Sequence, residues 1–279
     1  MKKVGYLFIA PWLIGLLIFT VFPIFYSLYL SFFDVSFTAT GIATQGVGIA
    51  NFVQAISTDI TFLRLVGGFT SNALLSIPII VLLALVIALL LNLDIKGKGI
   101  FRTIFFMPVI VSSGPVIDML IRMGITSIPR LHHYAFYNIL ASADNILANS
   151  MLTIIDSIII LLWLSGVQIL IFLAGLQKLS AQTYEAAKID GASKWEIFWK
   201  ITLPSISSVI LINIIYTTVM YAQSTLNPII THISDNMFNL QTGFGYSSAL
   251  AWIYFVVIFL VMGLLAWVYY MFTKEERRR

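Results

Sequence analysis

Residues 184–204 read YEAAKIDGASKWEIFWKITLP and are the most informative stretch of this 279-residue chain. Three lysines and three acidic residues fall within it, whereas long runs of Leu, Ile, Val and Phe lie on both sides. The whole chain is 59% hydrophobic and only 10% charged, whereas an ordinary soluble domain has about 25% charged residues. This composition predicts an integral membrane protein, in which residues 184–204 form a polar connection between apolar segments.

Six apolar stretches are separated by polar breaks, and each is long enough to cross a bilayer as a helix of about 20 residues. They lie at about 4–30, 72–93, 103–121, 152–176, 205–224 and 246–272. We therefore expect an all-α membrane protein with six transmembrane helices in a single transmembrane domain, 1–279, and a loop at about 177–204. The first stretch is too long for a signal peptide and no A-x-A cleavage site follows it, so we expect an uncleaved helix.

The distribution of Lys and Arg predicts the orientation of these helices. With the N-terminus inside, the inner segments hold 13 of the 16 basic residues, and only Arg64, Arg122 and Arg130 remain outside. Cytoplasmic loops carry the excess of Lys and Arg, so we expect both termini and the loop 177–204 in the cytoplasm. This orientation explains the net charge of +4 without a nucleic-acid partner. The absence of Cys excludes disulfides and Cys-ligated metal sites.

The loop has the pattern of two short helices joined by a glycine turn. Ser180 is a favourable N-cap for a helix through TYEAAKID, and Gly191 stands where a helix end requires a left-handed residue. Ser193 and Glu196 form an S-x-x-E capping box that begins the second helix. We expect that helix to end near Leu203-Pro204.

The side chains of the loop favour a contact surface, although a lysine-rich loop of this kind is also typical of a segment that only sets orientation. Ala186, Ala187 and Gly191 have little side-chain bulk, so another protein could approach the backbone closely. The aromatic residues of the second helix share one face, which we expect to pack on the helix bundle or to lie at the headgroup level. They are Trp195, Phe198 and Trp199.

The order of residues in the loop resembles the EAA motif of permease subunits of binding-protein-dependent ABC importers. That motif reads E-A-A-x3-G-x9-I-x-L-P, and every position of it is matched here. The matching residues are Glu185, Ala186, Ala187, Gly191, Ile201, Leu203 and Pro204. Stretches at 6–34, 96–111 and 243–261 are similar to the carbohydrate-uptake branch of the family, which includes the maltose, glycerol-phosphate and multiple-sugar types.

This resemblance implies the fold of a type I ABC importer permease in the plasma membrane of a prokaryote. It implies a subunit that translocates a sugar or oligosaccharide delivered by an extracellular solute-binding protein. It also implies a second permease subunit, forming a heterodimer, and two cytoplasmic ATPase subunits. By position, Glu185 would be the charged contact to the ATPase and the small residues would permit close docking. Ile201, Leu203 and Pro204 would fix the exit into the fifth helix.

The sequence lacks a phosphate-binding loop of the form G-x4-G-K-[ST]. The only Gly-Lys pair is Gly97-Lys98, and it has Asn92 where the first glycine should stand. We therefore expect that this chain is not an enzyme and binds no cofactor, and that ATP and Mg²⁺ are used by the partner ATPase.

Polar residues of the fifth predicted helix are candidates for the solute path, because they fall within a sector of about 100°. They are Asn213, Tyr216, Thr217, Ser224 and Asn227. Asn and Thr can bond to sugar hydroxyls, and the Tyr ring offers a stacking face. The same residue types also join transmembrane helices to one another, so packing is an equal alternative.

The remaining polar residues favour structural roles. Asp118 and Arg122 are spaced to pair at the outer end of the third helix, and Asp156 is either a functional carboxylate or a solvated or capping group. The histidines show no metal-ligand spacing and are expected at the surface. They are His132, His133 and His232.

Other functional classes fit the sequence less well. An ion-coupled secondary transporter would use Asp118 or Asp156, but it predicts inverted repeats and broken helices, of which the sequence shows no clear sign, and it leaves the EAA spacing unexplained. A membrane-embedded enzyme would need a cluster of catalytic groups, and we find none in the sequence. Within the ABC importer class, the alternative cargo is a non-sugar solute such as a polyol or glycerol phosphate.

Overall fold

The computed structural model describes most of the chain, in two units. The described residues are 2–38, 41–93, 99–100, 103, 119, 134–143, 148, 151–152, 155, 161–162, 164–224, 227–239 and 241–276. The first unit contains Met1–Gly68 and Asn227–Val257, and the second contains Phe69–Leu226 and Ile258–Arg279. Each unit is described by itself. Two long helices, α4 (Ile60–Asn92) and α16 (Gly243–Glu276), contribute residues to both.

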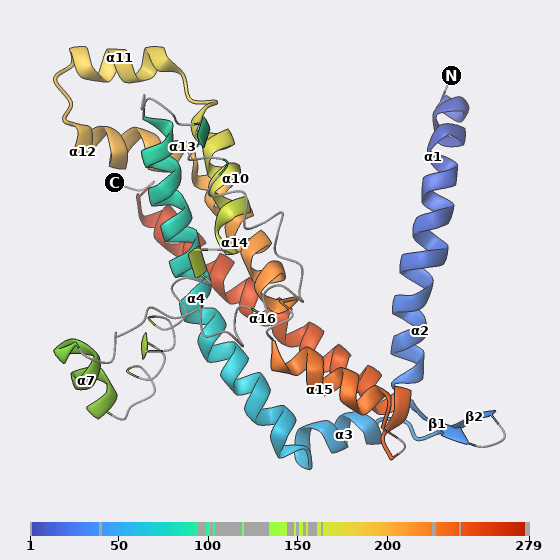
Figure 1. The fold of residues 1–279 in the computed structure, drawn as a ribbon. Coiled ribbons are helices and arrows are strands. Elements are labelled where there is room, and N and C mark those ends of the chain that lie inside the picture. Colours follow the sequence, from blue (N-terminus) through green and yellow to red (C-terminus); the bar gives the residue numbers. More distant parts are fainter. Residues whose placement is uncertain are drawn as a thin grey trace. The chain divides into compact units, whose positions relative to one another are not determined.

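The first unit begins with one long apolar helix. The segments α1 (Lys2–Leu16), η1 (Leu17–Val21) and α2 (Phe22–Leu30) follow one another without a break (Figure 1). The π-helical turn η1 precedes Pro23, whose ring would clash with the carbonyl four residues earlier, and the wider turn accommodates that ring. Residues Phe8–Leu30 have a mean hydropathy of 2.3 and bury none of their side chains within the chain, as expected for a helix in contact with lipid or another subunit.

A hairpin and a short helix follow. The strands β1 (Phe33–Thr38) and β2 (Gly41–Gly46) pair antiparallel, with Phe33 opposite Gly46. The next helix, α3 (Ala50–Ser57), is held by the buried Asn51, whose Nδ2 donates to the carbonyls of Ser31 at 2.9 Å and Phe33 at 3.0 Å. This one amide therefore ties α3 to the junction of α2 and β1.

The first unit is completed by α15 (Pro228–Met237) and the beginning of α16. The Asn227 side chain caps α15 by accepting from the Ile229 N–H at 3.1 Å, and its amide donates to the Tyr254 hydroxyl. The Trp252 indole donates to Ser27 Oγ at 3.2 Å. At Gly245, a Cβ atom would stand 1.8 Å from the Phe33 carbonyl oxygen, so α16 and the start of β1 pack backbone against backbone.

The second unit contains the loop 177–204 and the helices before and after it in the chain. In chain order they are the rest of α4, α7 (Ala135–Ser142), α10 (Gly166–Leu176), α11 (Ala181–Ile189), α12 (Lys194–Ile197), η3 (Phe198–Thr202), α13 (Leu203–Ser205), α14 (Ser207–Ala222) and the rest of α16. A Cβ added at Gly175 would lie only 2.8 Å from a Val209 methyl group, which shows that α10 and α14 pack closely. Figure 1 shows α11 and α12 beyond the end of α10.

Three described helical segments are long and apolar enough to span a membrane: Phe8–Leu30, Ile60–Asn92 and Gly243–Lys274. A fourth is added if Lys194–Ser205 and Ser207–Ala222, which meet at a 64° bend, form one span. Helix α4 begins well before the predicted start at residue 72. The predicted span 103–121 lies outside the described residues apart from two isolated positions, and about a third of 152–176 lies outside them too. Six spans and cytoplasmic termini therefore stay predictions.

Gly245→Ala should destabilise the protein, because the new methyl group would collide with backbone that cannot move aside. We expect a loss of at least about 3 kcal/mol, the upper end for overpacking. Gly263→Ala in the same helix is the control, since nothing lies within 4 Å of its added Cβ. Thermal unfolding of the purified proteins in detergent measures both, and equal unfolding temperatures would show that the close approach of α16 to β1 does not exist.

Candidate functional site

The EAA segment forms the first short helix of the loop, α11, as the sequence predicts. The helix begins after Ser180, whose backbone is extended, although its side chain makes no capping hydrogen bond. It ends at Ile189, and Gly191, just past the helix end, has a φ of +80°. There the Ala192 N–H donates to the Ala187 carbonyl at 2.9 Å and the Gly191 N–H donates to the Lys188 carbonyl at 3.1 Å, which is a Schellman motif. The left-handed turn is thus confirmed, and it requires glycine.

The second short helix begins at the predicted capping box. Ser193 Oγ accepts from the Glu196 N–H at 3.2 Å, and the Glu196 carboxylate accepts from the Ser193 N–H at 3.0 Å. The carboxylate also accepts from the Ser193 hydroxyl at 2.9 Å. The two hydrogen bonds that it accepts from Ser193, with a smaller contribution from Lys200 at 3.3 Å, lower the pKa of the Glu196 carboxyl. The helix continues through η3 and α13 to Ser205, one residue beyond Pro204.

A contact that the sequence did not predict joins the two short helices. The hydroxyls of Tyr184 and Thr202 are hydrogen-bonded at 2.9 Å, and Thr202 is buried in η3. Tyr184 directly precedes the motif glutamate, and Thr202 lies between the motif residues Ile201 and Leu203. The hydrogen bond therefore connects the beginning of the motif to its end and fixes α11 against the helix that leads into α14.

The motif residues divide into exposed and packed groups. Glu185, Ala186, Gly191 and Pro204 are exposed, Ile201 and Leu203 are half-buried, and Ala187 is buried. Next to the exposed group, Ile189 is 86% exposed. Helix α11 therefore presents an acidic side chain, a small residue and a large apolar residue on the surface.

The aromatic side chains of the second short helix contact one another. The Trp199 ring lies 5.5 Å from Trp195 and 5.1 Å from Phe198, measured between ring centroids. Trp195 is 70% exposed, so the expected packing on the helix bundle is wrong for this residue within the described part of the chain. The alternative, that these aromatic side chains lie at the level of the lipid headgroups, stays a prediction.

The predicted polar stripe is only partly formed. Helix α14 ends at Ala222, so Ser224 follows the helix, and Asn227 caps α15 in the other unit. Asn213 and Thr217 lie together on the buried face of α14, whereas Tyr216 is 37% exposed. A single five-residue stripe on one helix is therefore wrong, because the sector was extended past the end of the helix.

The buried pair makes two kinds of contact. The Thr217 hydroxyl and the side-chain amide of Gln168 in α10 are hydrogen-bonded at 3.1 Å, which joins α10 to α14. Asn213 Nδ2 donates to the Val209 carbonyl of its own helix at 3.3 Å, and its Oδ1 is buried and accepts from no described residue. Thr217 is thus used for packing, while Asn213 keeps an acceptor facing the interior.

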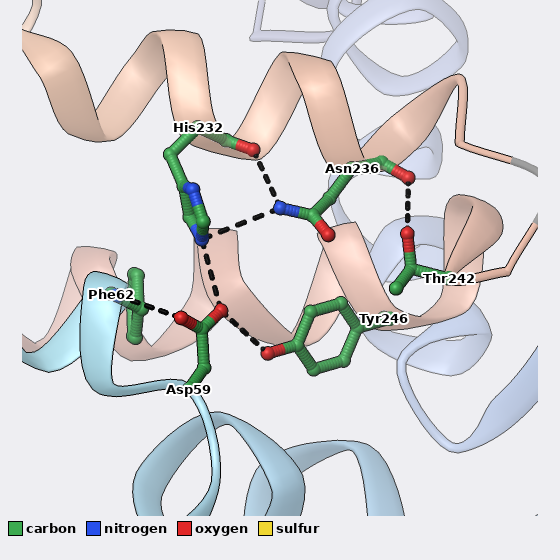
Figure 2. A network of polar contacts seen from close by, with 6 residues as sticks. All are labelled: Asp59, Phe62, His232, Asn236, Thr242 and Tyr246. Atoms are coloured by element: carbon green, nitrogen blue, oxygen red, sulfur yellow. Dashed lines mark hydrogen bonds and ion pairs between the residues drawn. The ribbon is translucent and has the colours of Figure 1, made fainter.

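A polar network in the first unit was not predicted. Figure 2 shows Asp59 between His232 of α15 and Tyr246 of α16. One carboxylate oxygen lies 2.9 Å from His232 Nε2 and accepts from the Tyr246 hydroxyl at 2.9 Å. The other accepts from the Phe62 N–H at 2.8 Å, so Asp59 also caps the start of α4. The expectation of a surface histidine is wrong for His232, whose side chain is 19% exposed and bonded to Asp59.

The network keeps the Asp59 carboxyl ionised. Burial alone would raise its pKa, but the hydrogen bonds from Phe62, His232 and Tyr246 and the charge of His232 outweigh burial, so its pKa lies below the ordinary value. The described residues contain no group of three His, Asp or Glu side chains that could hold a metal ion. The other residues singled out in the sequence, Asp118, Arg122, Asp156, His132 and His133, lie outside the described residues.

Known proteins resemble this chain in sequence and in fold. Residues 144–277 match the family described as the binding-protein-dependent transport system inner membrane component. The chain is 30% identical to the probable ABC transporter permease protein YesP of Bacillus subtilis, over 98% of this chain and 93% of that protein. It belongs to the ABC transporter permeases. The permease is therefore the membrane subunit of an importer and is not itself an enzyme, and its family implies an ATPase and a binding protein as partners.

Further comparisons agree with this assignment. The permease is 30% identical to the multiple sugar-binding transport system permease protein MsmF of Streptococcus mutans, over 93% of each chain. A chain in the crystal structure of a bacterial alginate ABC transporter, bound to its periplasmic protein, matches with a TM-score of 0.61. That match covers 95% of the permease and 93% of that chain at 18% identity, and it shows the type I importer permease fold.

Asp59→Asn should weaken the first unit by about 1–2 kcal/mol, since the amide cannot accept all three hydrogen bonds as a charged group. Because the folded-state pKa is lowered, the contribution of the carboxylate is complete above the ordinary pKa of about 3.9 and is lost as the pH falls below it. The difference in unfolding temperature between wild type and variant should be present above about pH 5 and shrink below about pH 4. Asp235→Asn, at an exposed position of α15, is the control.

Proposed function

We propose that this permease imports a sugar or oligosaccharide that an extracellular solute-binding protein delivers. In this proposal it pairs with a second, different permease subunit and two ATPase subunits, with both of its termini in the cytoplasm. Its relatives include a lactose transport system permease of Rhizobium radiobacter and a trehalose/maltose transport system permease of Thermococcus litoralis. Their names, together with the sugar-branch stretches of the sequence, support a carbohydrate cargo.

A non-sugar solute is the second candidate. It is favoured by a relative that is 31% identical over 74% of this chain and is named an osmoprotective compounds uptake permease, from Synechocystis. Mass spectrometry of the small molecule that co-purifies with the binding protein distinguishes the two. A polyol or glycerol phosphate in that position would contradict the sugar proposal, whereas a saccharide would support it.

The observation that carries the coupling mechanism is the exposed EAA helix, which is linked through η3 and α13 to α14. In the proposal, the ATPase takes α11 in a cleft, with Glu185 paired to a basic group and Ala186 and Gly191 allowing close approach. The Tyr184 to Thr202 hydrogen bond transfers movement of α11 to η3. From there the chain passes through the 64° bend into α14, which carries the buried polar residues.

The energy for uphill import comes from the partner in this proposal. Nucleotide-driven closure of the ATPase pair moves α11, and the permease converts that movement into alternate opening of its helices. The missing phosphate-binding loop supports this division of labour, with ATP and Mg²⁺ held by the ATPase. This chain then needs no cofactor of its own.

Asn213 is the residue that we place on the solute path. It is fully buried in α14, and its unused carbonyl oxygen can accept from a sugar hydroxyl. Thr217 has a smaller part in the path because Gln168 already engages it. Tyr216 keeps an exposed ring at the edge of the same face, and its stacking role remains part of the proposal. Ser224 and Asn227 lie beyond α14 and are no longer proposed on its polar face.

Glu185→Arg should abolish both ATPase association and uptake, because it replaces the proposed contact charge with a like charge. Gln182→Arg is the matched control: it adds the same side chain at an exposed position of α11 and leaves Glu185 in place. Co-purification of the ATPase and uptake of labelled sugar by cells measure the two effects. If the Glu185 variant kept both, α11 would not be the coupling element.

Asn213→Leu should leave the amount of permease in the membrane unchanged and reduce uptake at least about fivefold, because a hydrogen-bond partner lost from a polar site costs about 1–3 kcal/mol. The control is Thr218→Val, which removes a buried hydroxyl of α14 that bonds only to its own helix, at the Ile214 carbonyl. Immunoblotting gives the level and labelled-sugar uptake gives the activity. A lower level with unchanged uptake per molecule would assign Asn213 to packing.

A further inference from the structure

A cavity of about 210 Å³, with several hydroxyl groups and a lysine in its lining, lies in the second unit between the beginning of α14 and the end of α16. Ser207 and Ser208 line it from α14, and Tyr269, Tyr270 and Lys274 line it from α16. The Tyr269 hydroxyl donates to the Ser207 carbonyl at 2.9 Å, so the two helices are joined at the cavity wall. Lys274 is exposed and forms no ion pair with a described residue. The cavity therefore combines hydroxyl groups with one free positive charge.

A second cavity, of about 270 Å³, adjoins the first and is lined almost entirely by apolar groups. Its lining includes Leu82 and Pro78 of α4, Ile210 of α14 and Phe272 of α16. Tyr269 lines both cavities, so they meet at this ring. A ligand that fills both must carry an anionic or strongly polar group directly attached to an apolar chain.

We propose that these two cavities bind one anionic phospholipid. Lys274 and the hydroxyls of Ser207 and Ser208 supply donors for a phosphate group. The apolar cavity beside Leu82 and Phe272 takes part of an acyl chain. The first cavity lies between α14 and α16. The apolar cavity lies along α4 and α16, two segments that are long and apolar enough to span the membrane, so an acyl chain has direct access to it.

The predicted orientation is consistent with a lipid of the cytoplasmic leaflet. Lys274 lies at the C-terminal end of α16, and the sequence continues with two glutamates and then Arg277, Arg278 and Arg279. Basic pockets between transmembrane helices on the cytoplasmic side suit anionic headgroups. A free phosphate or sugar phosphate shares the headgroup chemistry but would leave the apolar cavity unfilled. The adjoining cavity thus favours a lipid over a soluble ligand.

The site has a consequence for the neighbouring loop. Ser207 directly follows the 64° bend at which the loop helices meet α14. A headgroup held between Ser207 and Lys274 would brace α14 against α16 at this point, in addition to the hydrogen bond from Tyr269. The bound lipid would then steady the junction between the EAA loop and the membrane.

Native mass spectrometry of the purified transporter complex tests the proposal. The complex is incubated with phosphatidylglycerol or with phosphatidylcholine, and the lipid retained per permease chain is counted. We expect the wild type to retain phosphatidylglycerol in preference. Lys274→Gln should reduce that retention about fivefold, the effect of one basic residue at an anionic membrane surface. Leu82→Trp, at an exposed position of α4, should reduce it independently by filling the apolar cavity.

Two controls make the result decisive. Lys178→Gln removes an exposed lysine of the same unit outside both cavities and should leave lipid retention unchanged. The soluble headgroup sn-glycerol 3-phosphate should not displace the lipid. If this compound displaced the lipid, the site would be one for a soluble phosphate ligand. If the wild type and the three variants retained equal amounts of phosphatidylglycerol, the retained lipid would be bound without specificity around the protein. Loss of the second permease subunit from the Leu82→Trp complex, without loss of lipid, would make the apolar cavity a subunit contact. Each of these three results would overturn the proposal.

Discussion

Backbone N–H and C=O groups in the hydrocarbon layer must find their partners within the chain, and the rest of this structure follows from that constraint. It imposes long apolar helices such as α4 and α16 and requires that buried polar side chains, such as Thr217 and Gln168, be hydrogen-bonded. The Asp59 carboxylate accepts from a backbone N–H in the first turn of α4 and is also hydrogen-bonded to side chains of α15 and α16. Asn213 is the exception, because it is polar, fully buried and has an unused acceptor within α14.

The loop between α10 and α14 is stabilised by local contacts and leaves its outer side free. The Schellman turn at Gly191 and the capping box of Ser193 and Glu196 define two short helices, and the hydrogen bond between Tyr184 and Thr202 closes them into one unit. In the proposed mechanism the two helices move together, and a displacement of α11 at Glu185 or Ile189 is passed on to α14.

The features predicted correctly from the sequence are those determined by neighbouring residues. The capping box and the left-handed glycine depend on residues three or four positions apart, and the EAA spacing identified the family. The contact of Asp59 with His232 joins residues 173 positions apart, so no local pattern could reveal it. The five-residue polar stripe failed because periodicity does not show that α14 ends at Ala222. The early start of α4 was missed because its first residues, including Arg64, are less apolar than the rest, whereas Asp59 caps it as a helix from Ile60.

The central claim is that this permease meets its ATPase through α11. The chain has no Cys, so Ala186→Cys can carry a single photoreactive label in the assembled transporter. Gln45→Cys, exposed in β2 and predicted to lie on the opposite side of the membrane, is the comparison. Illumination should join the label at position 186 to the ATPase subunit and give no such adduct from position 45. The account is contradicted if position 186 gives no adduct, or if both positions give it equally.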